Sequence, residues 1–448
     1  MFGRSILRQT LAMLSTYIVL LHMGTAYAWA ASHMSFFQSK QGHGFTDEEC
    51  TMVASLMHIG RLSAPIVNLL VMGKYGRKPP LTLASFLMVI ASLMQIIYKS
   101  VTAVYIARCL MGFGIGTYDG FGIIYQGEIT SKHVRGIFLT LNAAFYAGGI
   151  LLQYILAYYF TFEETSLITT TLAVFHVLLA YFMVESPYYL AEQGKLAEAS
   201  KVLGWLRAKE EKQIENELQE ISTIEKVTDY SEFFINFKKP EVYKSYCISL
   251  LLGIVASILM TTMVAFANYI VPDTGVVSSY HFGMLLCIIP MCSGFISAAL
   301  VERCGRRPLL IVSLFMETIV NGIIAVMFLL QQQFHVEISH FSWIVFALVV
   351  LFFVTYSIGT YPMVLAVRSE IFPPSYKVLG INICIGLNST TNFVFTIFFM
   401  EVVLKYGMYL NYVVFSLACL VGLLIVYFFL PETKGKTLAE IQSMLKKS

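Results

Sequence analysis

The stretch MGKYGRKPPL, residues 72–81, interrupts a chain that is otherwise mostly apolar. It places three basic residues around Gly76, between one apolar run and the next. A related stretch, ERCGRRPLL, spans residues 302–310 and again places basic residues around a glycine. We call these stretches the first and the second basic loop. Because they lie about half a chain apart, the sequence predicts a duplicated architecture with one basic loop in each half.

The composition is that of a membrane protein. Of the 448 residues, 57% are hydrophobic and only 13% are charged, whereas soluble proteins carry about 25% charged residues. A helix needs about 20 apolar residues to cross a hydrocarbon layer of about 30 Å, and the chain contains many runs of that length. We therefore expect an all-α, multi-pass protein embedded in the lipid bilayer. The net charge of +3 does not point to nucleic acid, and the scattered cysteines have no metal-ligand spacing, so no metal or other cofactor is expected.

Twelve apolar runs are expected to be transmembrane helices, six on each side of a long polar segment. They cover approximately residues 9–31, 51–72, 80–98, 101–125, 137–160, 166–185, 245–270, 279–300, 308–331, 341–367, 378–403 and 408–430. The expected organisation is an N-terminal six-helix bundle (1–185), a helical linker (186–243), a C-terminal six-helix bundle (244–430) and a tail (431–448). Short cytoplasmic loops carry an excess of lysine and arginine, and both basic loops fall on the same side as the linker and the tail. The termini are therefore predicted to be cytoplasmic.

Six short motifs then identify a family. In chain order they are RCLMGFGIG (108–116), YQGEITSKHVRG (125–136), VESPYYL (184–190), ERCGRRPLL (302–310), SEIFPPSYKVLG (369–380) and PETKGKTLAEI (431–441). With these motifs the chain resembles, over almost its whole length, the sugar porters of the major facilitator superfamily, and among them the facilitated trehalose and glucose transporters of insects. The resemblance implies two pseudo-symmetric six-helix bundles. It also implies transport of a hexose or a disaccharide such as trehalose by alternating access, as facilitative uniport across the plasma membrane. An enzyme is not expected, because no catalytic constellation occurs in the loops.

Charges at the ends of the predicted helices are expected to form a gate. The resemblance implies salt bridges that hold the outward-facing state and break as the cytoplasmic side opens. The residues expected to take part are Arg77, Glu128, Arg135, Glu185, Glu302, Arg303, Arg306, Arg307, Glu370 and Lys377. The alternative is that these charges only set the topology. The second basic loop keeps an acid–base pair at Glu302–Arg303, whereas the first has Gly73–Lys74, so we expect the stronger salt-bridge network in the C-terminal half.

The solute site is expected near the membrane midplane, between the two halves. Sugar recognition needs amide side chains, which both donate and accept hydrogen bonds. Gln153 stands where the family has a sugar-contacting glutamine, although such a residue is often only a hydrogen bond between helices. Asn388 and Asn392 match a paired-asparagine pattern of the family, and Asn268 is a polar candidate in the seventh span.

The expected pocket also departs from the family pattern. The seventh span lacks the QQxSGxN signature, and Leu365 stands at the position of a sugar-stacking tryptophan. Asp119 lies mid-span and is a further candidate for solute binding; a charge at this depth needs a cavity or a partner, and Arg61 is a candidate partner. The pair is either a structural bridge or part of a solute or proton site. Two alternatives to uniport stay open: a transport-deficient nutrient sensor, and a proton-coupled symporter of a non-standard solute that uses Asp119.

Overall fold

A computed structural model describes residues 2–39, 44–71, 75–97, 100–131, 134–208, 211–222, 237–265, 279–334, 342–373, 376–436 and 438–447. Nearly all of these residues are helical, and no strand occurs within the described ranges. The prediction of an all-α protein is confirmed.

The long helices match the twelve predicted spans. In the first half they are α1 (Phe2–Ser32), α3 (Asp47–Val71), α4 (Lys78–Ile96), α5 (Val101–Ile129), α6 (Arg135–Tyr159) and α7 (Phe162–Tyr181), with the short α2 (Met34–Gln38) after α1. In the second half they are α12 (Pro240–Ala265), α14 (Ser279–Cys304), α15 (Arg306–Phe334), α16 (Ser342–Thr355) continued by η2 (Tyr356–Thr360) and α17 (Tyr361–Ile371), α18 (Lys377–Tyr406) and α19 (Met408–Phe429). Within the described residues, eleven of the twelve segments are long and apolar enough to cross a membrane, and α14 adds a shorter apolar stretch, Cys287–Val301.

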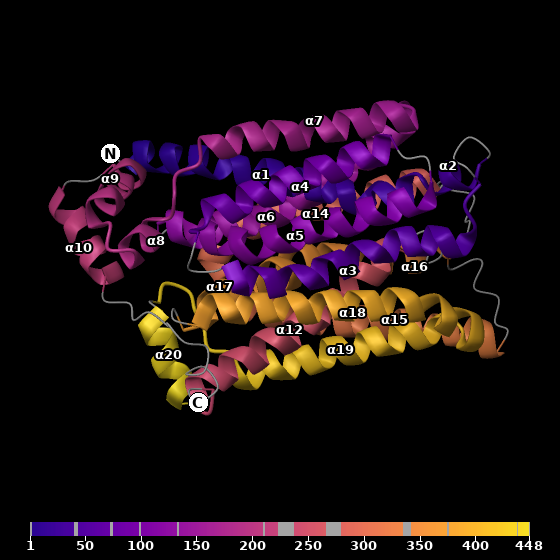
Figure 1. The fold of residues 1–448 in the computed structure, drawn as a ribbon. Helices are drawn as coiled ribbons and strands as arrows, with labels where there is room; N and C mark the ends of the chain where they lie inside the picture. The colour runs from indigo at the N-terminus through magenta and orange to yellow at the C-terminus, as the bar shows by residue number, and fades with distance from the viewer. Residues whose placement is uncertain are drawn as a thin grey trace.

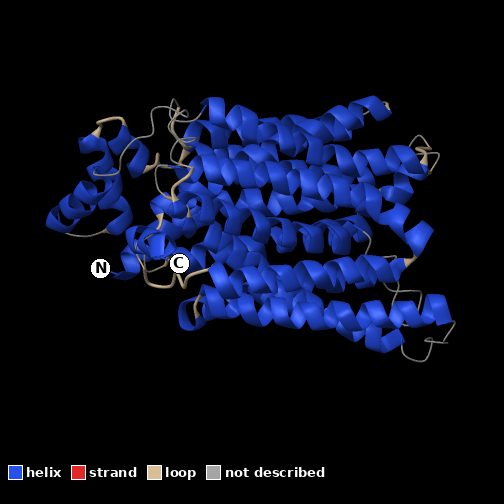
Figure 2. Cartoon of the chain, turned by 90° about the horizontal axis from the view of Figure 1, so that it is seen from below, coloured by secondary structure: helices blue, strands red, loops and turns tan. Residues whose placement is uncertain are grey.

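Four shorter helices gather at one end of the bundle. The polar segment predicted as a helical linker contains α8 (Pro187–Glu192), α9 (Leu196–Arg207) and α10 (Glu211–Ser222), and the tail forms α20 (Leu438–Lys447). Figures 1 and 2 show these helices and both chain termini at the same end of the molecule. We call it the terminal end. Hydrogen bonds from Ser5 and Arg8 of α1 to carbonyls of α9 hold the linker there.

Two helix pairs make the largest contacts between the two halves. α14 of the second half packs against α6 of the first half, and α18 of the second half packs against α3 of the first half. Glycines allow the closest approaches within the first half: a side chain at Gly112 or Gly116 of α5 would collide with the backbone of α3. Small residues serve this purpose in membrane helices because there is no hydrophobic driving force between them in lipid.

The tenth span is interrupted where it meets the centre of the molecule. Its π-helical turn, η2, is followed by Pro362 in the first turn of α17. Proline lacks a backbone N–H and removes one bond of the helical ladder, and π-turns often occur at functional sites. Behind this turn the fully buried Glu317 of α15 accepts a hydrogen bond from Thr360 Oγ1 at 2.6 Å. The turn therefore has a polar anchor in the neighbouring helix.

Candidate functional site

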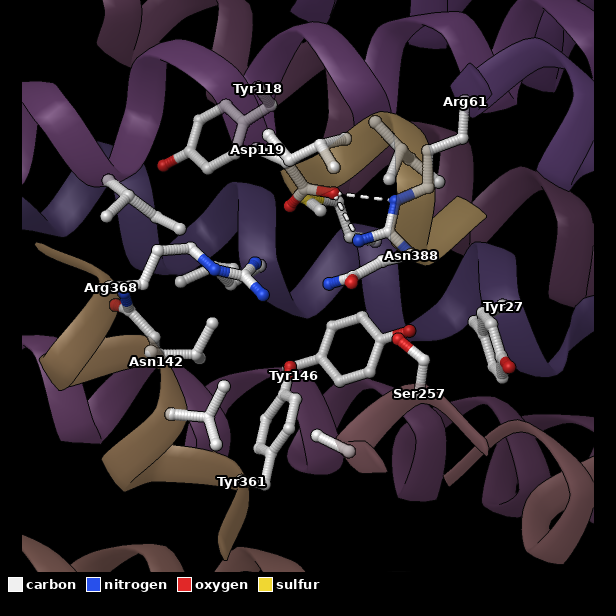
Figure 3. A pocket seen from close by; sticks show the side chains of 18 of the residues that line it. Tyr27, Arg61, Tyr118, Asp119, Asn142, Tyr146, Ser257, Tyr361, Arg368 and Asn388 are labelled. Atoms are coloured by element: carbon white, nitrogen blue, oxygen red, sulfur yellow. Dashed lines mark hydrogen bonds and ion pairs between the residues drawn. The ribbon is translucent and has the colours of Figure 1, made fainter. Parts of the chain in front are cut away.

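A cavity of about 120 Å³ lies between the two halves (Figure 3). Its wall comes from α1, α3, α5 and α6 on one side and from α12, η2, α17 and α18 on the other. A water needs about 10–15 Å³ of such volume, so the space is large enough for several waters or a small solute. Its polar lining residues come from both halves and are Tyr27, Arg61, Tyr118, Asp119, Gln126, Asn142, Tyr146, Ser257, Tyr356, Tyr361, Arg368, Asn388 and Asn392.

Arg61 and Asp119 form an ion pair across the first half. Arg61 lies on α3 and Asp119 on α5, and both Nε and Nη2 of the guanidinium reach the same carboxylate oxygen, Oδ2, at 2.8 and 2.7 Å. The side chains are 24% and 17% exposed. The pairing expected from the sequence is confirmed, and both partners also line the cavity. The charge on Asp119 is thus balanced inside the first half.

Arg368 of α17 faces the same cavity and lies beside Asn388 of α18. The Asn388 amide is best oriented with its oxygen toward Arg368, where it accepts from Nη1 at 3.3 Å and Nη2 at 3.0 Å, while its nitrogen donates to the Cys384 carbonyl at 3.2 Å. Figure 3 shows the guanidinium directed toward Asn388 and the Arg61–Asp119 pair. Sequence reasoning missed Arg368. The one indication of its role in the sequence was the position of Arg368 two residues before the glutamate of the SEIFPPSYKVLG motif.

The other predicted solute residues divide into three groups. Asn388 and Asn392 line the cavity, as does Leu365 at the position of the family's tryptophan. Gln153 is fully buried elsewhere in α6: its Nε2 donates to Ser32 Oγ at 3.2 Å, and its Oε1 accepts no hydrogen bond from the described residues. Asn268 lies outside the described residues.

At the terminal end, the first basic loop is tied to three other segments. The guanidinium of Arg77 binds Glu128 of α5 through Nε at 3.1 Å and Nη2 at 3.0 Å, and it also reaches Glu192 of α8 at 3.3 Å. The Glu185 carboxylate accepts from the backbone N–H groups of Arg77 and Lys78 at the start of α4. Burial lowers the pKa of the Arg77 guanidinium, but the charges of Glu128 and Glu192 more than reverse this and raise it overall.

The second basic loop repeats this arrangement. Arg306, at the start of α15, binds Glu370 of α17 through Nη2 at 3.2 Å. The Glu432 carboxylate accepts from the backbone N–H groups of Arg306 at 3.1 Å and Arg307 at 3.0 Å. Glu432 therefore takes the place that Glu185 has in the first half. It belongs to the quoted PETKGKTLAEI motif, but its role as a helix cap was not predicted.

Three further gate candidates are placed as follows. The side chain of Arg303 is exposed, and Arg307 Nη2 donates to the Tyr427 carbonyl at 2.7 Å. The side chain of Glu302 lies outside those that the structure describes. Because the expected ranking of the two networks rested on Glu302, the stronger C-terminal network stays a prediction. The expected ranking also rested on the missing acidic residue at position 73 of the first loop. That argument was incomplete, because Glu192 gives Arg77 a second carboxylate in addition to Glu128.

Contacts between the halves also lie toward the terminal end. Asn68 Nδ2 of α3 donates to Asn382 Oδ1 of α18 at 2.9 Å, and both side chains are buried. Lys377, at the start of α18, is close enough to Gly127 of α5 that a Cβ there would lie 3.6 Å from Nζ. Its charge interacts with those of Arg135 and Glu128 from the first half and with that of Glu370 from its own. Predicted gate residues from both halves therefore meet around Lys377.

One basic residue in the membrane has a structural role. Arg108 of α5 is almost fully buried, donates to the carbonyls of Val53 at 3.0 Å and Ala26 at 2.8 Å, and lies over the Trp29 ring at 5.6 Å. Neutral carbonyls and an aromatic face thus surround the guanidinium.

Taken together, the paired halves, the polar cavity between them and the matched loops at one end define a multi-pass transporter of the major facilitator fold. The family model described as sugar (and other) transporter matches residues 18–445. The chain belongs to this sugar transporter family.

Several curated relatives are facilitated trehalose transporters named Tret1. The protein from Bombyx mori is 28% identical over 409 residues, which cover 89% of this chain and 80% of the relative. The protein from Culex quinquefasciatus is 26% identical over 447 residues, covering 97% and 85%. The relatives named here are transporters.

Solved structures of the xylose transporter XylE share the fold. The proton:xylose symporter bound to 6-bromo-6-deoxy-D-glucose has a TM-score of 0.80 at 17% identity, with 99% of each chain covered. The inward open conformation of XylE from E. coli has a TM-score of 0.71 at 17% identity, with 96% of this chain and 98% of that chain covered. At this identity the likeness is one of fold alone.

Proposed function

We propose that this chain carries a sugar, a hexose or a disaccharide such as trehalose, across the plasma membrane by alternating access. The observation that supports this most is the central cavity, whose polar wall is built from residues of both halves. The mode is facilitative uniport, in line with the names of the Tret1 relatives. Both termini are cytoplasmic, following the basic residues of the loops at the terminal end. The chain is a transporter without an enzymatic step.

The transport cycle moves the bundle of residues 1–185 against the bundle of residues 244–430. The Arg77–Glu128 and Arg306–Glu370 ion pairs each lie within one half, so they keep the helix ends of that half together during the movement. The contacts that must break are those between the halves, which include the Asn68–Asn382 hydrogen bond. When they break, the terminal end opens and the cavity reaches the cytoplasm. Gln153 and Asn268 remain predicted solute contacts, to be tested beside Asn388, Asn392 and Asp119.

The decisive experiment is uptake of labelled glucose and trehalose into proteoliposomes that contain the purified chain, with and without a pH gradient. We expect saturable uptake that equilibrates the sugar and does not depend on the gradient. Asn392→Ala should raise KM because the residue lines the cavity, whereas Arg4→Gln at the exposed start of α1 should leave uptake unchanged. Accumulation driven by an inward proton gradient, lost in Asp119→Asn, would show symport. Sugar binding without flux of any sugar would show a sensor.

A further inference from the structure

The central cavity contains one arginine more than its carboxylates balance. Among the described lining residues the charged groups are Arg61, Asp119 and Arg368. Arg61 and Asp119 neutralise each other at 2.7 Å. No carboxylate of the described residues lies within 4 Å of the Arg368 guanidinium. The described wall therefore carries one net positive charge.

Arg368 is buried but incompletely bonded. The residue is only 4% exposed. Its guanidinium has five N–H donors, yet the described residues offer it a single neutral acceptor, the Asn388 oxygen, and Nε has none. A buried charge without a partner is expensive in a protein and more so at membrane depth. An anion that enters the cavity would remove this cost.

A glycine on a neighbouring helix leaves space for the Arg368 side chain. Gly253 of α12 faces the guanidinium, and any Cβ at that position would collide with Arg368 Nη2 and lie 2.7 Å from the nearer atom of the Asn388 amide. The Asn388 nitrogen is held by the Cys384 carbonyl, which fixes the amide oxygen toward the arginine. Residues of three helices, α12, α17 and α18, thus position the Arg368 guanidinium at the wall of the cavity. A planar fork held in this way suits the two oxygens of a carboxylate.

We propose that the preferred solute is a sugar that carries one acidic group, with the acidic group bound by Arg368 and the hydroxyls bound by the neutral polar wall. Ser257, Tyr146 and Tyr361 line the same cavity as Arg368 and offer hydroxyl groups to the sugar ring. This rests on the proposed function, because it names the solute class of the same cavity. Uniport of such a solute moves net negative charge in each cycle, about one charge for a carboxylate and up to two for a phosphate, so uptake responds to the membrane potential.

The test compares D-glucuronate with D-glucose, which differ only in a carboxylate for a hydroxymethyl group, and adds glucose 6-phosphate as a second acidic probe. Binding to the purified full chain is read from the concentration of each compound that raises its thermal stability in detergent. We expect at least one acidic probe to bind about tenfold or more tightly than glucose, since charge-assisted hydrogen bonds are worth that factor. The better probe identifies the acidic group as carboxylate or phosphate.

Two variants assign this preference to Arg368. Arg368→Leu should bring the binding of the acidic sugar down to that of glucose. Asn388→Asp, which is of the same size, places a carboxylate beside the guanidinium and should have the same effect even if Arg368→Leu does not fold. Arg4→Gln removes an exposed arginine as the matched control and should keep the preference.

In proteoliposomes, an interior-positive potential should increase uptake of the acidic sugar several-fold and leave that of glucose unchanged. The inference is overturned by equal binding of acidic and neutral sugars, by a preference that survives Asn388→Asp, or by stabilisation with chloride that equals that with the acidic sugars. If neutral sugars are transported without this preference, the further inference fails and the proposed function stands. If an acidic sugar binds but is not transported, the proposed transport fails and the binding preference stands.

Discussion

The first and the second basic loop lie at the same end of the bundle, one in each half, and share a local design. Each contains a glycine with a positive backbone angle, Gly76 with φ of +80° and Gly305 with φ of +90°. In each, a Cβ on that glycine would collide with the carboxylate that caps the following helix, Glu185 or Glu432. Each of the two positions requires glycine for two reasons, the left-handed backbone conformation and the close approach of the capping carboxylate.

The loops differ in the segments that complete them. In the first half, Arg77 is held by Glu128 of the bundle and by Glu192 of the linker helix α8, and its guanidinium lies over the Tyr189 ring at 5.4 Å. In the second half, the cap Glu432 comes from the tail that leads into α20. Each loop thus fastens a different extramembrane segment to the bundle. The comparison teaches that the duplicated loops keep one backbone design and take their carboxylates from corresponding helix ends of the two halves. Glu128 and Glu370 lie at the ends of α5 and α17, and Glu185 and Glu432 follow α7 and α19. The loops differ in Glu192 of the linker, which only Arg77 binds among the described ion pairs.

The largest effect is expected from Arg77→Gln, which tests the ion pair at the centre of the first loop. The side chains of Arg77 and Glu128 are 7% and 11% exposed, so the variant removes the arginine partner of a buried carboxylate and leaves it the hydrogen bond from Ser186 Oγ. Such a loss costs about 3–5 kcal/mol of unfolding free energy. The measurement is thermal and denaturant unfolding of the purified protein in detergent. Lys78→Gln is the control, because its ammonium group donates to the Tyr181 carbonyl, lies over the Tyr181 ring and pairs with no carboxylate of the described residues. An equal loss in both variants would refute the assignment.

The next effect tests whether the two caps are equivalent. Glu185 accepts backbone hydrogen bonds from Arg77 at 2.9 Å and Ser186 at 2.8 Å, and Glu432 accepts them from Arg306 at 3.1 Å and Lys434 at 2.8 Å. Because the geometry matches, Glu185→Gln and Glu432→Gln should each cost about 1–2 kcal/mol. Unfolding of the two variants under one set of conditions measures this. A loss in one variant that is more than twice that in the other would show that the design is not shared.

Much of the architecture could be predicted from the sequence, because a spanning helix needs a continuous apolar run and leaves one. The interruption of the tenth span at Tyr356–Thr360 could not. Pro362 signals a disturbance of the helix, but only the neighbouring helices decide that it becomes a π-turn. The helical character of the linker could be predicted from its amphipathic pattern. The tail helix α20 and the carboxylates that the linker and the tail contribute to the loops were not predicted.

The central site was predictable where a charge stood out in an apolar run. Asp119 and Arg61 were found in this way, and their pairing followed from the high cost of isolated charges in a membrane. Arg368 lies near a loop motif and reads as one more cytoplasmic charge, so its direction into the cavity appeared only in the structure. Asn68 and Asn382 are single polar residues 314 positions apart, and nothing in one sequence pairs them.

A third prediction separates contacts within a half from contacts between halves. Asn68→Ala removes the hydrogen bond to Asn382 and should shift the population toward the form opened at the terminal end by about fivefold, as expected for about 1 kcal/mol. Hydrogen exchange at the ends of α3 and α18 measures that opening. Asn142→Ala is the control, because Asn142 binds Gln126 at 2.6 Å inside the first half. Equal opening in both variants would mean that the Asn68–Asn382 bond does not connect the halves energetically.

The smallest effect is expected from Glu192, which gives Arg77 a second carboxylate although position 73 of the first loop is not acidic. Glu192 is 37% exposed in its side chain, and solvent-exposed ion pairs contribute about 0–1 kcal/mol, so Glu192→Gln should lower stability by less than 1 kcal/mol. If Glu192 serves in place of an acidic residue in the loop, then Gly73→Asp should add little to the native protein, although position 73 itself lies outside the described residues. The same change should restore stability and uptake in the Glu192→Gln background, because Arg77 then regains its second carboxylate. Unfolding and uptake of the two single variants and the double variant form a complete cycle. Additive effects would mean that the two carboxylates act on different partners, and the linker would then have its own role in the gate.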